Sequence, residues 1–181
     1  MYKSAIHIYG ASGSGTSTLG KFISEQLGYT FMDTDDYFWL PTNPKYTKKR
    51  DKAERLQMME KDILKSDKSV ISGSLVDWGD NLIPYFTLAV RVITDSKVRI
   101  DRLREREKRY FGSRIEIGGD MYQNHLEFIE WAASYYTGDV TMRSKVKHDD
   151  WQRLLRCRQI IVNGEDDLTY NLELIKDNLL L

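Results

Sequence analysis

Residues 4–18 read SAIHIYGASGSGTST, and this stretch decides the fold. Its first six residues are mostly apolar, which is typical of a buried strand, and the run ends at Gly10. A helix with one apolar face follows and Gly28 ends it; the apolar residues are Leu19, Phe22, Ile23 and Leu27. A glycine-rich loop between a buried strand and an amphipathic helix predicts the start of an α/β domain.

Strands and helices alternate along the rest of the chain. Apolar runs predict four more strands, at about residues 29–32, 69–73, 88–93 and 159–162. Amphipathic runs predict three more helices, at about residues 47–66, 96–110 and 168–180. Such alternation is typical of a parallel sheet that helices cover on both faces. We therefore expect a single domain over residues 1–181, with a three-layer α/β fold doubly wound around about five parallel strands.

Two additional helices interrupt this alternation. They are predicted at about residues 120–136, with Asp120 as the N-cap, and at about residues 141–156. Both fall between the fourth and the fifth strand. We therefore expect a helical insert or lid at about residues 112–156.

The composition limits the classes of function. The formal net charge is zero, so the chain lacks the strongly basic character of a general nucleic-acid-binding domain. No segment approaches the roughly 20 apolar residues of a membrane span. The single cysteine, Cys157, excludes an internal disulfide and fits a reducing compartment. We expect a cytoplasmic protein whose partner is a small molecule, not a membrane or a nucleic acid. The sequence leaves the oligomeric state open.

The glycine-rich loop has the spacing of a phosphate-binding loop. Glycines let main-chain N–H groups turn toward an anion, and the N-terminus of the next helix adds a partial positive charge. Ser17 stands where a hydroxyl group ligates magnesium. A flexible linker is the alternative, but a linker would not join a strand and a helix so well formed. The candidate nucleotide contacts are Gly10, Ser12, Gly13, Ser14, Gly15, Thr16, Ser17 and Thr18.

One position of the loop departs from the usual pattern. Thr16 stands where a lysine normally reaches the outer phosphates. Electrostatic stabilisation of the transferring phosphoryl group is most of what such a site does. Either another cation replaces this lysine, or phosphoryl transfer is slow or lost. Lys21 lies one helical turn further on and is expected to point away, so the arginines near residues 96–110 are the better candidates.

These motifs, in this order, resemble those of the adenylate kinase and shikimate kinase group of P-loop kinases. The resemblance rests on the loop, on Phe31-Met32-Asp33-Thr34-Asp35 and on Arg102-Leu103-Arg104-Glu105-Arg106. It implies that the γ-phosphate of ATP moves, with Mg²⁺, to a small metabolite or a nucleotide. It also implies that Ser17 and Asp33 lie at the magnesium ion, and that Asp35 binds the acceptor hydroxyl and takes its proton. The alternatives are a solvated acidic turn and, because of Thr16, a nucleotide-binding protein with weakened or lost kinase activity.

A row of arginines follows the fourth predicted strand. Its members are spaced three or four residues apart, which places them on one face of a helix: Arg99, Arg102, Arg106 and Arg109. A bound polyanion is the simplest reason for such a cluster. The resemblance implies that Arg102 and Arg106 contact phosphate or adenine and that Arg109 and Arg114 lie at the lid. Arg102, Arg106 and Arg109 are therefore the catalytic candidates beside Asp35. A solvated face with pairs such as Glu105–Arg109 is the alternative.

Three residues are candidates for the acceptor site. Trp39 belongs to the aromatic loop at residues 37–46, which could stack a substrate or form a local hydrophobic plug. Arg50 belongs to a basic run that points to an anionic acceptor, although such runs often serve solubility alone. Gly73 follows the third strand, where the resemblance implies a glycine next to the substrate. The sequence does not identify the acceptor.

Overall fold

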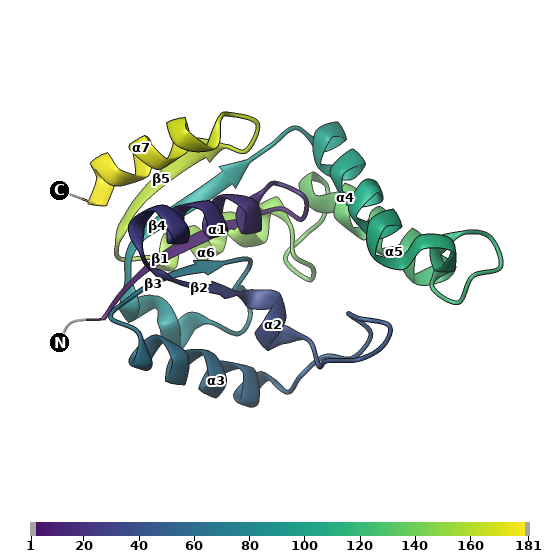
Figure 1. Ribbon diagram of the computed structural model, residues 1–181, viewed down its shortest axis with the longest axis horizontal. Helices are drawn as coiled ribbons and strands as arrows, with labels where there is room; N and C mark the ends of the chain where they lie inside the picture. The colour runs from purple at the N-terminus through teal and green to yellow at the C-terminus, as the bar shows by residue number, and fades with distance from the viewer. Residues whose placement is uncertain (1–2, 180–181) are drawn as a thin grey trace.

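The apolar runs of the sequence form one parallel sheet in the computed structural model, which describes residues 3–179. The strands are β1 (Ser4–Gly10), β2 (Thr30–Asp33), β3 (Lys68–Ser72), β4 (Phe86–Ile93) and β5 (Arg158–Asn163). They pair in the order β2-β3-β1-β4-β5, and every pairing is parallel. The doubly wound α/β fold is confirmed (Figure 1).

Helices connect the strands. The α-helices are α1 (Thr16–Leu27), α2 (Thr34–Phe38), α3 (Lys52–Lys65), α4 (Ser96–Phe111), α5 (Tyr122–Ala133), α6 (Lys145–Leu154) and α7 (Leu168–Leu179). Short 3₁₀ helices are η1 (Asp80–Tyr85), η2 (Gly112–Ile115) and η3 (Ser134–Tyr136). The last helix was predicted to reach Leu180, which lies outside the described residues.

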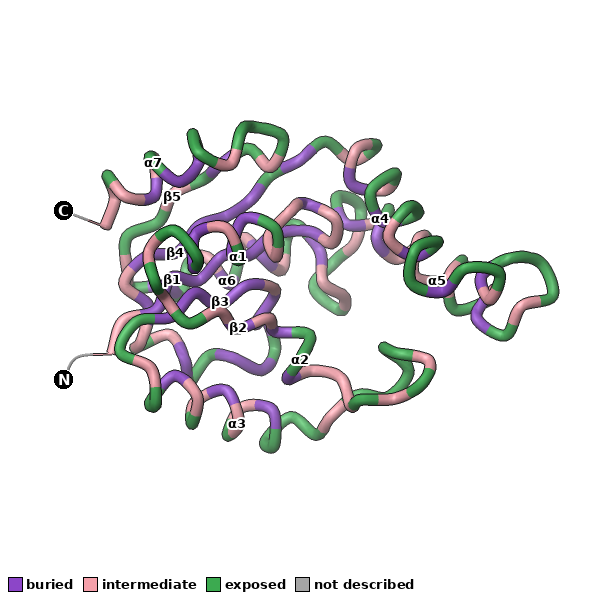
Figure 2. Tube along the Cα trace, in the orientation of Figure 1, coloured by how far each residue is buried: buried purple, intermediate pink, exposed green. Residues whose placement is uncertain are grey.

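Helices cover both faces of the sheet, because successive side chains of a strand point to opposite faces. On one face, strand residues such as Ile6 and Ile8 pack against α1 and α7, through Ile23 and Ile175. On the other face, a second cluster joins Tyr9, Ile71 and Ala89 to α3, η1 and α6, through Met59, Ile63, Leu82 and Trp151. Figure 2 shows the strands as mostly buried between these layers. The three-layer arrangement is the one expected.

The structure departs from the expected helices in three places. Residues 34–38 form the short helix α2 instead of a loop. The N-cap of α5 is Met121, without a side-chain hydrogen bond, because the carboxylate of Asp120 pairs with Arg114. Helix α6 packs on the sheet, where Trp151 is 3% exposed, so the projecting segment is shorter than residues 112–156.

Helix α4 follows the carboxyl end of β4 and continues through η2 into α5. Together, α4, η2 and α5 project to one side of the molecule (Figure 1). A third small cluster, formed by Phe111, Ile115 and Met121, holds the turn between them. Arg114 donates a hydrogen bond of 3.3 Å to Asn43, so this projecting segment touches the loop that follows α2. Within residues 3–179, no helix combines the length and the apolar character that a membrane span needs.

Candidate functional site

The loop between β1 and α1 is held in its shape by close contacts. Gly13 and Gly15 have φ angles of 80° and 98°, a region that glycine adopts without strain. A Cβ atom on Gly10 would lie 2.5 Å from the carbonyl oxygen of Val92, and one on Gly13 would lie 2.5 Å from that of Arg99. Both glycines are therefore required by β4 and α4, which pack directly against the loop. This excludes a flexible linker.

The loop turns its carbonyl groups away from the N-terminus of α1. Thr94 donates to the Ser14 oxygen at 2.9 Å, and Arg99 donates to the Ser12 oxygen at 2.8 Å. The N-cap of α1 is Gly15, which offers no side-chain acceptor, and the first turn holds no acidic residue. The first N–H groups of α1 have no intrahelical acceptor, so they are available to an anion. The loop and helix fit the phosphates of a nucleotide.

The two predicted magnesium ligands lie together. The Ser17 hydroxyl donates to Asp33 Oδ2 at 2.8 Å. Oxygen donors of this kind suit Mg²⁺, which usually keeps several waters and binds through one or two protein groups plus phosphates. Within residues 3–179 there is no group of three or more His, Cys, Asp or Glu side chains that could hold a metal alone. The arrangement therefore fits a magnesium ion that arrives with a nucleotide.

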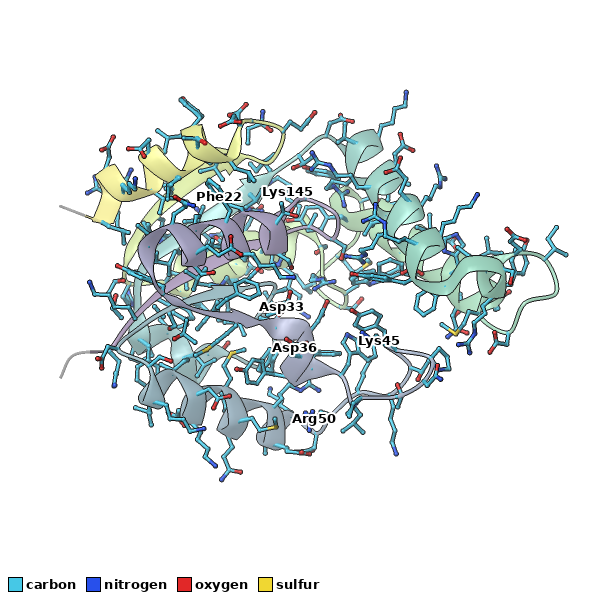
Figure 3. All side chains as sticks on the ribbon, viewed as in Figure 1. Phe22, Asp33, Asp36, Lys45, Arg50 and Lys145 are labelled. Carbon is cyan, nitrogen blue, oxygen red and sulfur yellow. The ribbon has the colours of Figure 1, made fainter. Side chains whose placement is uncertain are left out.

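The two aspartates meet through a helix cap. Strand β2 ends at Asp33, whose Oδ1 accepts a hydrogen bond of 3.0 Å from the Asp35 main-chain N–H. On a continuing strand, two carboxylates two residues apart would project to the same side. Helix α2 instead starts at Thr34 and turns Asp35 out of the sheet. Figure 3 shows Asp33 and, on α2, Asp36 near the same end of the sheet.

Side chains from three other segments interact with Asp35. The group consists of Asp35, Trp39, Tyr46, Arg106 and Arg143, and we call it the Asp35 cluster. Trp39 and Tyr46 form an edge-to-face pair with centroids 6.0 Å apart. The two arginines come from α4 and from the segment before α6. The cluster thus joins carboxylate, aromatic and guanidinium groups next to the phosphate loop.

The pKa of the Asp35 carboxyl is raised above its ordinary value of 3.8. Asp35 is open to solvent on one side but surrounded by protein on the others, and this partial loss of water is the main cause. The charge of Asp33 raises the pKa further, and Arg143 and Arg106 oppose the shift. A carboxylate with a raised pKa is a better proton acceptor than an ordinary one, as a general base requires.

The four arginines of α4 that were expected to bind one anion together have different contacts. Arg99 is fully buried and binds the Ser12 and Ala132 carbonyl oxygens behind the loop. Arg102 donates to the Gly164 oxygen at 3.2 Å, whereas Arg106 belongs to the Asp35 cluster. Arg109 is exposed, and it is not among the charges that act on Asp35. Arg109 is therefore not brought to the site.

The predicted acceptor residues have different surroundings. Trp39 belongs to the Asp35 cluster. Arg50 donates to the Tyr37 and Trp39 carbonyl oxygens and forms an ion pair with Glu54 at 2.9 Å, so its charge braces the loop after α2.

Gly73 lies against another residue of the site. Its φ is 113°, and a Cβ atom there would collide with the Thr34 hydroxyl. Close packing next to Asp33 and Asp35 therefore explains this glycine without a substrate.

A pocket of about 290 Å³ opens beside the phosphate loop. It is lined by Gly15, Thr18, Leu19, Val92, Arg102, Gly164, Glu165, Asp166, Leu168 and Asn171. This volume is at the lower end of ligand pockets and suits a planar base better than a whole nucleotide. Arg102 and Thr18 therefore lie at the pocket, not beside Asp35. Residues 164–168, which follow β5, were not among the predicted site residues, and their sequence carries no signal of this role.

Arg143 is the residue of the site that sequence reasoning missed. Its guanidinium donates to the Ser12 hydroxyl at 2.8 Å, across 131 residues of sequence, and stacks on Trp131 at 4.7 Å. It was assigned to a helix of the insert, and no spacing pattern connects it to the loop. Only the fold brings it there.

Comparison with known sequences places the chain in a family. It is 41% identical over 169 residues to the uncharacterized protein YqaC of Bacillus subtilis (strain 168). The match covers 93% of this chain and 92% of that protein. The chain belongs to the YqaC family. No family model matches the sequence.

Solved structures show which fold this YqaC-family chain has. A gluconokinase from Sinorhizobium meliloti 1021 matches 99% of the chain and 93% of its own length, with a TM-score of 0.54 and 18% identity. Shikimate kinase from Bacteroides thetaiotaomicron matches 98% and 99%, with a TM-score of 0.55 and 18% identity. Deoxyadenosine kinase from M. mycoides matches 97% and 98%, with a TM-score of 0.52 and 16% identity. The chain has the P-loop small-molecule kinase fold, as the sequence motifs indicated.

Proposed function

We propose that the protein is a kinase that transfers the γ-phosphate of ATP, with Mg²⁺, to a hydroxyl group of a small molecule. The observation that carries this proposal is the position of Asp35. Its main-chain N–H donates to Asp33, two residues earlier, and Asp33 accepts a hydrogen bond of 2.8 Å from Ser17 of the phosphate loop. A carboxylate with a raised pKa thus lies beside the place where a nucleotide would present its outer phosphates.

The nucleotide would occupy the loop and the pocket beside it. Its phosphates would meet the N–H groups of the loop and of the first turn of α1, and its base would enter the pocket lined by Arg102 and Gly164. Ser17 and Asp33 would hold the magnesium ion, which neutralises charge on the phosphates. These roles are supported by the oxygen-rich donor set and by the absence of a competing cap on α1.

The acceptor would bind in the Asp35 cluster. The Asp35 carboxylate would take the proton of the acceptor hydroxyl while the oxygen–phosphorus bond forms, and the bond to the β-phosphate breaks to leave ADP. Trp39 and Tyr46 offer aromatic surface, and Arg106 offers positive charge. This combination suits a small acceptor that carries a hydroxyl group together with an anionic group or a nucleobase.

Thr16 supports a second candidate function, nucleotide binding without transfer. The neutral side chain removes a charge that kinases of this type place on the outer phosphates. We rank this candidate second because two arginines of the Asp35 cluster can supply positive charge near the loop.

Turnover of ATP separates the two candidates. The test measures ADP release with Mg²⁺ against a panel of nucleosides, nucleotides, sugars and hydroxy acids, next to calorimetric ATP binding. Transfer to at least one acceptor, and its loss when Asp35 is replaced by asparagine, is the expected result. Tight ATP binding without transfer to any acceptor would favour the second candidate. No binding of ATP, ADP or GTP would contradict both.

A further inference from the structure

The position of Thr16 raises the question of which cation meets the outer phosphates. The cation nearest to it in sequence, Lys21, does not fill the gap. Its ammonium group lies 5.7 Å from the ring centroid of Phe31 on β2, and its charge acts on Asp36 of α2. If another cation replaces the lysine, the arginines that the fold brings to the loop are the candidates.

Most arginines around the loop are engaged elsewhere. Arg99 holds main-chain oxygens behind the loop, and Arg102 holds the Gly164 oxygen. Arg114 forms a bidentate pair with Asp120, at 2.9 and 2.6 Å. Arg106 and Arg143 remain, and among the described residues neither has a carboxylate within ion-pair distance.

Arg143 alone of these two contacts the phosphate loop. Its guanidinium reaches the Ser12 hydroxyl at 2.8 Å and also lies within the electrostatic reach of Asp35. Ser12 belongs to the loop that would hold the phosphates, and Asp35 would face the acceptor. A phosphoryl group in transit lies between those two points. Arg143 is therefore next to the path of transfer.

The segment before α6 fixes this position. Ser144, which is fully buried, caps α6 through its hydroxyl and donates to the Asp139 carbonyl oxygen at 2.6 Å. The Trp131 ring packs on the guanidinium at 4.7 Å. A guanidinium held from both sides loses little further freedom when it binds an anion, so its charge is preorganised.

We propose that Arg143 contacts the outer phosphates of the bound nucleotide and replaces the lysine that Thr16 displaces. This inference rests on the proposed function, because it requires a nucleotide on the loop. A planar guanidinium can bind two phosphate oxygens at once, which a lysine cannot. In other phosphate-binding loops this charge comes from the lysine at the position of Thr16. Here it would come from Arg143, which lies 127 positions after Thr16 in the sequence.

The experiment compares the affinities of ATP and AMP by calorimetry in four proteins: the wild type, Arg143→Met, Arg143→Met with Thr16→Lys, and the control Arg109→Met. We expect Arg143→Met to lower ATP affinity about 10- to 100-fold, as for one charge-assisted hydrogen-bond donor. AMP lacks the β- and γ-phosphates, so its affinity should stay unchanged, which also shows that the variant is folded. Thr16→Lys should restore ATP affinity, and Arg109→Met should change neither.

Three results would overturn the inference. The first is wild-type ATP affinity in Arg143→Met together with a higher KM for the acceptor, because Arg143 would then bind the acceptor. The second is an equal loss of ATP and AMP affinity, which would mean that the variant damages the loop itself. The third is failure of Thr16→Lys to restore binding. A wild-type protein that binds neither nucleotide would instead contradict the proposed function, and the inference with it.

Discussion

The phosphate loop and the Asp35 cluster lie side by side but are built in different ways. The loop is one continuous segment, and its shape is set by strand β4 and helix α4, which pack against Gly10 and Gly13. The Asp35 cluster draws its residues from α2, the loop after it, α4 and the segment before α6. The loop is therefore fixed by the core of the domain, whereas the cluster depends on how the projecting segment sits against the sheet.

This difference separates two tasks. A continuous loop that packs on the core of the domain suits a ligand that is common to many enzymes, such as a nucleoside triphosphate. A cluster assembled from several separate segments can change one residue at a time, which suits a variable acceptor. Changes in the cluster should therefore alter transfer and acceptor binding, except at Arg143, which contacts Ser12 of the loop, and changes in the loop should alter nucleotide binding and stability.

The largest effect is expected at Asp35. Asp35→Asn removes the proposed general base, so we expect kcat to fall about 10²- to 10⁴-fold with ATP affinity unchanged. Because partial loss of water and the charge of Asp33 raise the pKa of Asp35, the wild-type rate should fall as the pH drops toward that raised pKa, at a pH above the ordinary 3.8. The carboxylate must be deprotonated to act, so activity is present above this pKa and lost below it. Steady-state kinetics from pH 4 to 8 measure both.

Asp36→Asn is the matched control for this prediction. Asp36 lies next to Asp35 on α2, is exposed, and faces Lys21 and Lys45 instead of the two arginines. Near-normal kcat is expected in this variant. Equal losses of kcat in both variants would mean that the acidic turn acts only through its total charge. Asp35 would then have no role as a general base that Asp36 does not share.

The same contrast explains what the sequence predicted. The sheet, its covering helices and the loop follow from periodicity and from glycine spacing within about ten residues, and they were predicted. Arg143 and the loop after β5 meet the site through packing between segments more than 100 residues apart, and no local pattern records that. The N-cap role predicted for Asp120 is wrong for a related reason, and the contacts of Arg50 were not predicted either. Their charges satisfy nearby carbonyl oxygens and an arginine, partners that the sequence alone does not reveal.

The second prediction tests the rigidity of the loop. Gly13→Ala would place a methyl group against the Arg99 carbonyl oxygen at a φ of 80°, so α4 or the loop must shift. We expect the free energy of unfolding to fall by about 2–3 kcal/mol and ATP affinity to fall with it. Chemical denaturation and calorimetry measure the two quantities.

Gly118→Ala provides a comparison with similar backbone strain. Its φ is 87°, but no heavy atom lies within 4 Å of the added methyl group, and it belongs to the turn beyond η2. We expect a loss of about 1 kcal/mol and no change in ATP affinity. If Gly13→Ala were as mild as Gly118→Ala, the loop would be far more adaptable than its contacts indicate.

The smallest effect is expected at Arg50, which braces the loop that carries Trp39. Arg50→Met removes donors to the Tyr37 and Trp39 carbonyl oxygens, so the aromatic wall should loosen while the phosphate loop is untouched. We expect KM for the acceptor to rise up to about 10-fold, with kcat and ATP affinity near wild type. An effect on ATP affinity instead would mean that the two regions are mechanically coupled. In that case a substitution on the acceptor side would also weaken nucleotide binding. The phosphate loop and the Asp35 cluster could then not vary independently of each other.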